Sequence, residues 1–375
     1  MTKYKFDEIA INSTQKKKPT EEDKVYYIGL EHIDPGCFDV VRWGSDVAPT
    51  GDKLLMQKGD VLFGKRRAYQ RKVAIAPFDG IFSAHGMVLR PNLKVIDANY
   101  FPFFISSDKF METAVRISVG GLSPTINWKD LARQEFELPS LDEQKVLADK
   151  LWAAYRLKEA YKKLLVATDE MVKSQFIEMF ENVESYCKLE DLISDTFPGE
   201  WGSEPISENV IKVIRTTNFT NEGYLDLTDV VTRDIEPKKV VRKKLKQGDT
   251  ILERSGGTKD NPVGRVVFFD EIGDYLPNNF TQVLRPKESV NPVYLFYALY
   301  NSYNLNKAAM RAMASQTTGI QNLSMSDFMA KSIVLPSRDE QNKFEQIYRQ
   351  ADKSKFELRK SIDAIDKVIR SLING

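Results

Sequence analysis

The sequence predicts an α+β protein that uses one unit twice, a globular domain of mixed α and β structure followed by a long helix. Three observations support this class. The heptapeptide LPSLDEQ at residues 138–144 returns as LPSRDEQ at residues 335–341, 197 residues later. Apolar residues follow each copy in heptad steps, and short β-branched and aromatic runs precede it. A chain of 375 residues has room for two such domains, each with its own core.

The repeat extends upstream of the heptapeptides. KGDVLF at residues 58–63 matches QGDTIL at residues 247–252, and the tripeptide LRP occurs at residues 89–91 and 284–286. The offset changes by a few residues along the chain, as loop insertions would make it. We therefore predict a first domain at 1–139, a central long helix at 140–185, a second domain at 186–336 and a C-terminal long helix at 337–375.

Short runs bounded by Gly, Pro or Asp predict the strands of both domains. GDVLF, KVAIAPF and GMVLRP are such runs in the first domain, and GDTIL, GRVVFF and TQVLRP are their counterparts in the second. Residues 99–115 and 293–310 are helical by composition. Both domains are therefore predicted to mix helices with sheets.

Each heptapeptide has the residues that begin a helix. A proline disfavours helix in the residue before it, and a serine follows the proline in both copies. The pairs Ser140–Glu143 and Ser337–Glu340 have the spacing of a capping box, in which serine and glutamate satisfy each other's backbone amides. A helix is predicted to start at each serine.

Both helices carry an apolar seam of period 3.5. Each has about 35 to 40 residues and a length of about 50 to 60 Å, too long for one small domain, so we expect the two to pack on each other within the chain. Docking of each seam on its own domain, or dimerisation of two chains, are the alternatives. One lysine interrupts each seam, Lys158 and Lys355, and it either fixes the register or reaches solvent from a partly open seam. The predicted seam consists of Leu147, Leu151, Tyr161, Leu165, Val172, Phe344, Tyr348, Leu358, Ile362, Ile365 and Ile369.

The composition is that of a well-solvated globular protein, with 42% hydrophobic and 29% charged residues. No run approaches the roughly 18 apolar residues of a membrane helix, and the start MTKYKFDEIA lacks the apolar core of a signal peptide, so a cytoplasmic location is expected. Two cysteines, Cys37 and Cys187, are too few for a disulfide framework and are expected to be buried thiols. A net charge of +1 neither demands nor forbids an acidic partner.

A basic loop in the first domain suits nucleic acid. The segment FGKRRAYQRK follows a predicted strand, and its cations suit phosphate contacts together with base-edge readout by arginine. His85, in SAHGM, is either a base contact or a packed or solvated histidine. The candidate DNA-binding residues here are Lys65, Arg66, Arg67, Tyr69, Arg71, Lys72 and His85.

The second domain has ERSGGTKDNPVGR at the corresponding place. Its glycines would let backbone amides approach a phosphate closely. A further basic run, PKKVVRKKLK at residues 237–246, is as well explained by a solvated face. The candidate DNA-binding residues of this loop are Arg254, Ser255, Gly256, Gly257 and Lys259.

No catalytic or metal-binding constellation is found. A methyltransferase would need a glycine-rich cofactor loop and an Asn-Pro-Pro-Tyr type tetrapeptide, whereas the nearest match, NPVY at residues 291–294, is better explained as a helix start. A nuclease would use Asp130 with Glu143, but Glu143 is better used as a capping group. The two histidines, His32 and His85, lack the partners that a metal site or a catalytic triad requires.

The order of domain, LPSLDEQ helix, domain and LPSRDEQ helix resembles the specificity subunit of type I restriction-modification systems. KGD turns, FDGIFSAHGMVLRP at residues 78–91 and TTGIQNL at residues 317–323 add to the resemblance, which covers essentially the whole chain. The chain departs from an even repeat in having GGLSPTI where the second copy has TTGIQNL. From that second segment Thr317, Thr318, Gln321 and Asn322 join the candidate DNA-binding residues.

The resemblance implies a function as well as a fold. Each domain would be a target recognition domain that reads one half of a bipartite DNA site. The helices would form an antiparallel coiled coil that sets the gap and docks two methyltransferase subunits, and restriction or motor subunits would join. The chain itself would have no catalytic site and no cofactor, because S-adenosylmethionine would bind to the methyltransferase subunits. A stand-alone restriction or modification enzyme and a coiled-coil adaptor protein are the other hypotheses.

Overall fold

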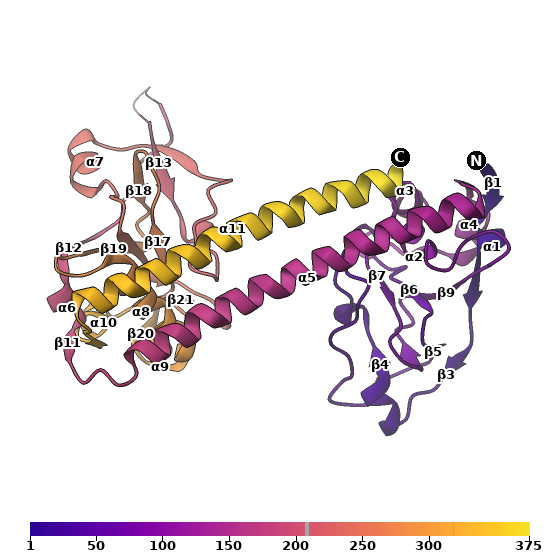
Figure 1. The fold of residues 1–375 in the computed structure, drawn as a ribbon, viewed down its shortest axis with the longest axis horizontal. Helices are drawn as coiled ribbons and strands as arrows, with labels where there is room; N and C mark the ends of the chain where they lie inside the picture. Colours follow the sequence, from indigo (N-terminus) through magenta and orange to yellow (C-terminus); the bar gives the residue numbers. More distant parts are fainter. Residues whose placement is uncertain (207–209, 318) are drawn as a thin grey trace. The chain divides into compact units, whose positions relative to one another are not determined.

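The computed structural model describes residues 1–206, 210–317 and 319–375. It contains two compact units, one formed by Met1–Lys163 with Leu358–Gly375 and the other by Leu164–Glu357 (Figure 1). Two long helices, α5 (Leu141–Phe180) and α11 (Arg338–Asn374), contribute one part to each unit. The predicted α+β class and internal repeat are confirmed, while the domain boundaries at 139, 185 and 336 stay a prediction.

The first unit is built on two sheets. Its main sheet has the order β2-β9-β6-β7 with antiparallel neighbours, and a second sheet has the order β3-β5-β8-β4, in which β4 and β8 run parallel. Strand β1 pairs with β10 and so brings the start of the chain beside the strand that leads into α5. The elements are β1 (Thr2–Lys5), α1 (Phe6–Ile9), β2 (Ala10–Ser13), β3 (Lys16–Lys17), β4 (Tyr27–Ile28), β5 (Lys53–Met56), β6 (Val61–Phe63), β7 (Val73–Ile75), β8 (Gly80–Phe82), β9 (Met87–Pro91), α2 (Phe101–Ser106), α3 (Asp108–Arg116), α4 (Trp128–Ala132) and β10 (Glu135–Leu138), with 3₁₀ turns at Glu21–Tyr26, Leu30–His32 and Ala68–Gln70.

The second unit repeats this plan. Its main sheet has the order β12-β19-β15-β17, and β11 pairs with β22 as β1 pairs with β10. Sheets of order β14-β13-β18 and β16-β21-β20 complete it. The elements are β11 (Tyr186–Lys188), α6 (Leu189–Leu192), β12 (Ile193–Pro198), β13 (Val210–Ile214), β14 (Val231–Asp234), α7 (Pro237–Lys243), β15 (Asp249–Glu253), β16 (Ser255–Gly256), β17 (Val266–Phe269), β18 (Tyr275–Pro277), β19 (Thr281–Pro286), α8 (Pro292–Leu305), α9 (Lys307–Ala312), β20 (Ala314–Thr317), β21 (Ile320–Leu323), α10 (Met325–Met329) and β22 (Ser332–Val334), with a 3₁₀ turn at Thr216–Asn218.

The repeated motifs GD and LRP form one ion pair in each main sheet. Arg90 donates from Nε and Nη2 to the carboxylate of Asp60, at 2.7 and 2.9 Å. Arg285 makes the same two contacts to Asp249, at 2.8 and 2.7 Å. In both units an aspartate at the start of one central strand thus holds an arginine near the end of the neighbouring strand, which gives the two repeated motifs a common structural role.

The two heptapeptides cap their helices in the same way, as predicted. The backbone amide and hydroxyl of Ser140 donate to Glu143 at 2.9 and 2.7 Å, and those of Ser337 donate to Glu340 at the same distances. The last residue of each motif, Gln144 or Gln341, is buried. Its side chain bonds the carbonyl of the motif's own proline and the amide of a distant turn. Each heptapeptide thus starts a helix, and its buried glutamine anchors that helix start to the domain.

Each segment predicted as helical inside the domains consists of two helices. Residues 99–115 are divided between α2 and α3 at Ser107, whose hydroxyl accepts from the amide of Phe110. The second segment is divided between α8 and α9 at Asn306. Asn291, in NPVY, caps α8 by accepting from two backbone amides, which confirms a helix start.

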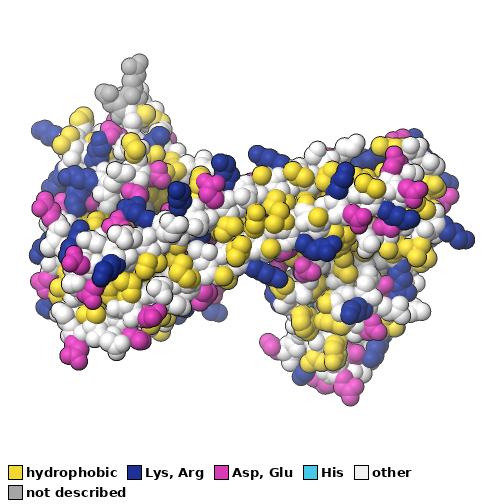
Figure 2. Space-filling view, viewed as in Figure 1, with side chains coloured by type: hydrophobic (Ala, Val, Ile, Leu, Met, Phe, Trp, Pro, Cys, Tyr) yellow, Lys and Arg dark blue, Asp and Glu magenta, His cyan; other side chains and the backbone are white. Residues whose placement is uncertain are grey.

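The two long helices pack antiparallel within the chain, because the start of α5 lies with the end of α11 in the first unit and the end of α5 lies with the start of α11 in the second. Apolar side chains also remain exposed along these helices (Figure 2). Among the proposed seam residues, Leu151, Val172, Phe344 and Tyr348 are buried, and Leu147, Tyr161, Leu165, Leu358, Ile362, Ile365 and Ile369 are half-buried.

Candidate nucleic-acid interface

Three loops of the first unit meet around the predicted basic segment. They comprise residues 65–67 after β6, residues 83–86 before β9, and residues 119–125. The amide of Arg66 donates to the carbonyl of His85 at 3.1 Å, and the amide of Arg67 donates to that of Pro124 at 2.7 Å. Because their backbones are bonded to one another, the three loops form one surface.

The basic loop holds two arginines in a rare backbone conformation. Arg67 and Arg71 have φ values of 56° and 54° and flank the 3₁₀ turn Ala68–Gln70. A left-handed backbone costs free energy in a residue that is not glycine, and such conformations cluster at functional sites. The turn between them presents Tyr69, which is exposed.

Positive charge accumulates where these loops meet. Burial lowers the pKa of His85, and the charges of Arg66, Lys65 and Lys53 lower it further. Burial also lowers the pKa of Lys65, with a smaller effect from Lys16. Lys16 and Lys53 lie on the neighbouring strands β3 and β5 and were missed by the sequence analysis, because only the fold brings them to the loop.

The imidazole of His85 is a partner of the arginine beside it. Its Nε2 lies 3.2 Å from Nη1 of Arg66. With its pKa lowered, the ring is neutral at neutral pH, so Nε2 accepts a guanidinium hydrogen. This contact orients Arg66.

The other cations of the predicted segment have partners within the protein. Arg71 donates to the carboxylate of Asp108 at 2.6 Å and to the carbonyl of Ser106, and Lys72 donates to the carbonyl of Leu30. Arg67 donates to the hydroxyl of Ser123. The contacts of Arg71 and Lys72 hold the loop to the rest of the unit.

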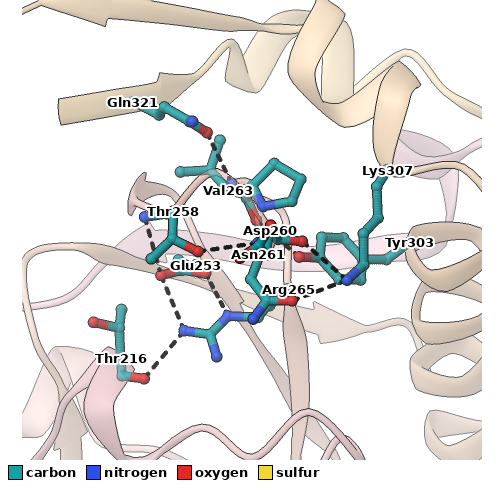
Figure 3. Close-up of polar contacts among 12 residues, drawn as sticks. Thr216, Glu253, Thr258, Asp260, Asn261, Val263, Arg265, Tyr303, Lys307 and Gln321 are labelled. Carbon is teal, nitrogen blue, oxygen red and sulfur yellow. Dashed lines mark hydrogen bonds and ion pairs between the residues drawn. The ribbon is translucent and has the colours of Figure 1, made fainter. Parts of the chain in front are cut away.

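In the second unit the corresponding loop, residues 254–264, starts and ends at a buried ion pair (Figure 3). Arg265 donates from Nε to Glu253 at 2.7 Å and from Nη2 to the same carboxylate at 3.2 Å. Nη2 also lies 3.3 Å from the carbonyl of Thr216. The two strands that frame the loop are thereby joined at its base.

Helices α8 and α9 hold the same loop from one side (Figure 3). The hydroxyl of Tyr303 donates to the carbonyl of Pro262 at 2.9 Å, and Lys307 donates to the side chain of Asn261 at 2.9 Å. Arg311 donates to the carbonyl of Lys259 at 2.8 Å. These contacts fix the loop to α8 and α9.

Several predicted reading residues of the second domain are bonded within the loop. The hydroxyl of Ser255 donates to Asn322 at 2.7 Å, and Gln321 accepts from the amide of Val263 at 3.3 Å. Gly256 and Gly257 are half-buried in the bend that follows, and Arg254 makes a long contact to a backbone carbonyl. Thr317 ends β20, and Thr318 lies outside the described residues. The exposed tip of the loop is Thr258, Lys259 and Asp260.

The second basic run contributes α7, where acidic partners are close. Lys243 and Lys239 lie 2.6 and 3.6 Å from Glu200, and Lys244 pairs with Asp274. Lys238 and Arg242 are exposed. Part of this charge is therefore balanced within the unit.

The described residues include no group of three or more His, Cys, Asp or Glu side chains placed to hold a metal ion. No helix in this part of the chain has the length and apolarity to span a membrane. Cys37 and Cys187 are free and half-buried, and burial raises the pKa of Cys187.

Comparison with known proteins identifies the repeated domain. A family model for the type I restriction modification DNA specificity domain matches residues 3–165 and again residues 195–365. The chain belongs to this family. It is a specificity subunit of a type I restriction-modification system, and its two domains carry DNA sequence recognition.

Individual relatives cover the same length. The chain is 20% identical over 387 residues to the EcoKI specificity subunit of Escherichia coli K12, which spans 94% of this chain and 82% of that one. The StySPI specificity subunit of Salmonella potsdam is 20% identical over 386 residues, with 94% and 81% covered. The fold is similar to that of the type I system S subunit from M. genitalium, with a TM-score of 0.58, 14% identity and 99% and 94% of the two chains covered. A chain from a structural study of the assembly of a type I restriction-modification system has a TM-score of 0.56 and 16% identity, with 99% of this chain and 96% of that chain covered.

Proposed function

We propose that this specificity subunit is a non-catalytic reader of a bipartite DNA site, with each domain recognising one half. The helices α5 and α11 set the number of base pairs between the halves and dock two methyltransferase subunits. Those subunits bind S-adenosylmethionine and methylate a base, and restriction or motor subunits join the complex. The observation that carries the proposal is the convergence of three bonded loops and the cations Lys16, Lys53, Lys65 and Arg66 on one surface of the first unit.

The differences between the loops of the two domains support the recognition of two different half-sites. The interface of the first unit combines a basic loop with a neutral histidine that orients Arg66. In the second unit the tip Thr258, Lys259 and Asp260 stands on an internally bonded loop. Arginine reads guanine edges, whereas a mixed tip presents both donors and acceptors. One frame with two different loops is what recognition of an asymmetric site requires.

The helices support the docking of a partner, because α5 carries a second apolar stripe besides its seam. Leu157, Leu164 and Met171 recur at heptad spacing and are 45%, 50% and 44% exposed. An exposed alanine stands four residues before each of them, at Ala153, Ala160 and Ala167, and keeps the surface narrow. Small and large apolar residues alternating in heptads are typical of a helix that packs against another helix. The positions 197 residues later on α11 are mainly polar, so the stripe belongs to α5.

The salt dependence of DNA binding tests the interface of the first unit. Replacing Lys65, Arg66 and Arg67 with alanine is expected to weaken binding and to flatten the plot of log affinity against log salt by ~0.9 for each phosphate that is no longer neutralised. The measurement is a fluorescence anisotropy titration at several salt concentrations, with the subunit in its complex. A control variant with Lys3, Lys94 and Lys129 changed to alanine loses the same charge from exposed positions outside the three loops. Equal slopes for the two variants would remove the loops from the interface.

The enzyme alternative has its own test. Incubation of the purified chain with DNA, Mg²⁺ and S-adenosylmethionine is expected to give neither cleavage nor methylation until methyltransferase subunits are added. If the complete complex did not bind DNA, the adaptor hypothesis would hold and the proposed function would be excluded.

A further inference from the structure

The lysine that interrupts each helical seam is buried against an aspartate of the other helix. Lys158 on α5 donates to Asp366 on α11 at 2.6 Å in the first unit. Lys355 on α11 donates to Asp169 on α5 at 2.7 Å in the second unit. The lysine side chains are only 11% and 6% exposed. Each pair therefore satisfies a charge that would be costly to leave buried alone.

The two pairs are one contact used twice. Lys355 stands 197 residues after Lys158, and Asp366 stands 197 residues after Asp169. Exchange of the two helices therefore converts one pair into the other. Because the helices are antiparallel, both pairs close at the same alignment of α5 with α11.

The apolar seam alone does not specify that alignment. Its positions recur every seven residues on both helices, so sliding one helix by a heptad again sets seam against seam. The lysines make such a slip unfavourable in either direction. In one slip, Arg359 takes the place of Asp366 opposite Lys158. In the same slip, Lys162 takes the place of Asp169 opposite Lys355, so like charges face each other at both positions. The opposite slip places the lysines against Ile373 and Phe176, where their charge would be buried without a partner.

The second pair is also tied to its recognition domain. The ammonium of Lys355 lies 4.9 Å from the ring centroid of Tyr224, within the range of a cation–π contact. Tyr224 follows Gly223, whose carbonyl accepts from the amide of Phe268 on β17 of the main sheet. A change of register would therefore disturb the domain as well as the helices.

We propose that Lys158–Asp366 and Lys355–Asp169 are a register lock that selects one alignment of the two helices and excludes its heptad neighbours. A slip of seven residues moves one helix along the other by about 10 Å. That displacement is equivalent to about three base pairs of DNA. Resting on the proposed function, the lock fixes the spacing of the two half-sites, and its four residues determine specificity without touching DNA.

Charge reversal tests the lock. The double variant Lys158→Asp with Lys355→Asp sets aspartate against aspartate in the native register but faces Arg359 and Lys162 in the slipped one. Spin labels on Lys150→Cys and Lys360→Cys, with Cys37 and Cys187 changed to alanine in the full chain, report the alignment by pulsed electron paramagnetic resonance. The label-to-label distance is expected to shorten by up to about 10 Å. Adding Asp169→Lys and Asp366→Lys is expected to bring back the native distance.

A variant without repulsion guards against loss of folding. Lys158→Met with Lys355→Met leaves an apolar seam and is expected to fold and to show a second distance beside the native one. This distance is longer by up to about 10 Å, because the register that sets positions 158 and 355 against Ile373 and Phe176 no longer buries a charge. A single native distance in both the Asp and the Met variants would overturn the lock, and so would failure of the fourfold exchange to bring the distance back.

Methylation by the complete complex distinguishes the register lock from the proposed role of the helices in spacing the two half-sites. Methylation of the native target is expected to fall at least tenfold in the charge-reversed variant and to return in the fourfold exchange. A changed label distance with unchanged methylation would leave the lock standing and contradict the role of the helices in spacing.

Discussion

Single residues explain why short motifs recur in this chain. In the heptapeptide, the serine and glutamate cap the helix, and the hydrogen bonds from Ser140 lower the pKa of Glu143. The glutamine serves a different purpose, since both Gln144 and Gln341 bond backbone groups of a turn that precedes α2 or α8. Backbone groups are present whatever the side chains are. The hydrogen bonds of this glutamine therefore do not depend on the side chains of the domain to which it binds.

The ion pair between the GD and LRP motifs gives a prediction for stability. Asp249→Asn is expected to lower the free energy of unfolding of the second unit by about 2 to 3 kcal/mol, because it leaves Arg285 in a largely buried place with Asp195 as its remaining acidic neighbour. Asp60→Asn should cost less, since the side chain of Arg90 is 34% exposed and that of Arg285 is 16% exposed. Urea titration followed by hydrogen exchange of β15 and β6 measures both losses. Equal losses would contradict the dependence on burial.

At the scale of elements, the recognition loop of the second unit owes its shape to the pair at its base. Glu253→Gln is expected to weaken the hold on Arg265 and to speed amide exchange of residues 256–263 at least tenfold, because Gly257 and both framing strands lose a charged anchor. Hydrogen exchange with mass spectrometry is the measurement.

The control is Asp274→Asn, which breaks the exposed pair with Lys244 in the same unit. Exposed pairs contribute little, so exchange of the loop should stay as in the wild type. Loop exchange that rises equally in both variants would show that Glu253 has no special part in the loop.

The long helices were the most predictable elements, because a heptad seam and a capping box are local patterns of residue type. The ion pairs of the seam lysines were not predictable, since Asp169 and Asp366 stand beside the seam and pair with residues about two hundred positions away. The division of α2 from α3 falls at the polar residues that follow Ile105, where Ser107 caps α3, although the composition of residues 99–115 as a whole predicted a single helix. At the proposed interface, residue type selected Lys65, Arg66 and Arg71 alike as candidates, and it could not show that Arg71 pairs with Asp108, which is distant in sequence.

At the scale of the whole molecule, the repeat makes the recognition domain an exchangeable part. Residues 186–336 contain both β11 and β22, so an exchange with these limits moves a complete strand pair. The capping box at Ser337 and the buried Gln341 stay with the recipient chain. The side chain of Gln341 hydrogen-bonds to the backbone amide of residue 291 and to the carbonyl of residue 336. Another domain of this family can supply both groups if its turn has the same shape.

The exchanged chain is expected to recognise a new second half-site and to keep the first half-site and the spacing. Methylome sequencing of cells that carry the native or exchanged chain with the same methyltransferase subunits reads all three features together. The apolar contacts of Phe344 and Tyr348 with Tyr297 are side-chain specific, so the donor needs an aromatic residue at that place or a loss of stability follows. A first half-site that changed with the second would mean that the two domains do not read independently. A spacing that changed would place the determinant of register inside residues 186–336 instead of in the helices.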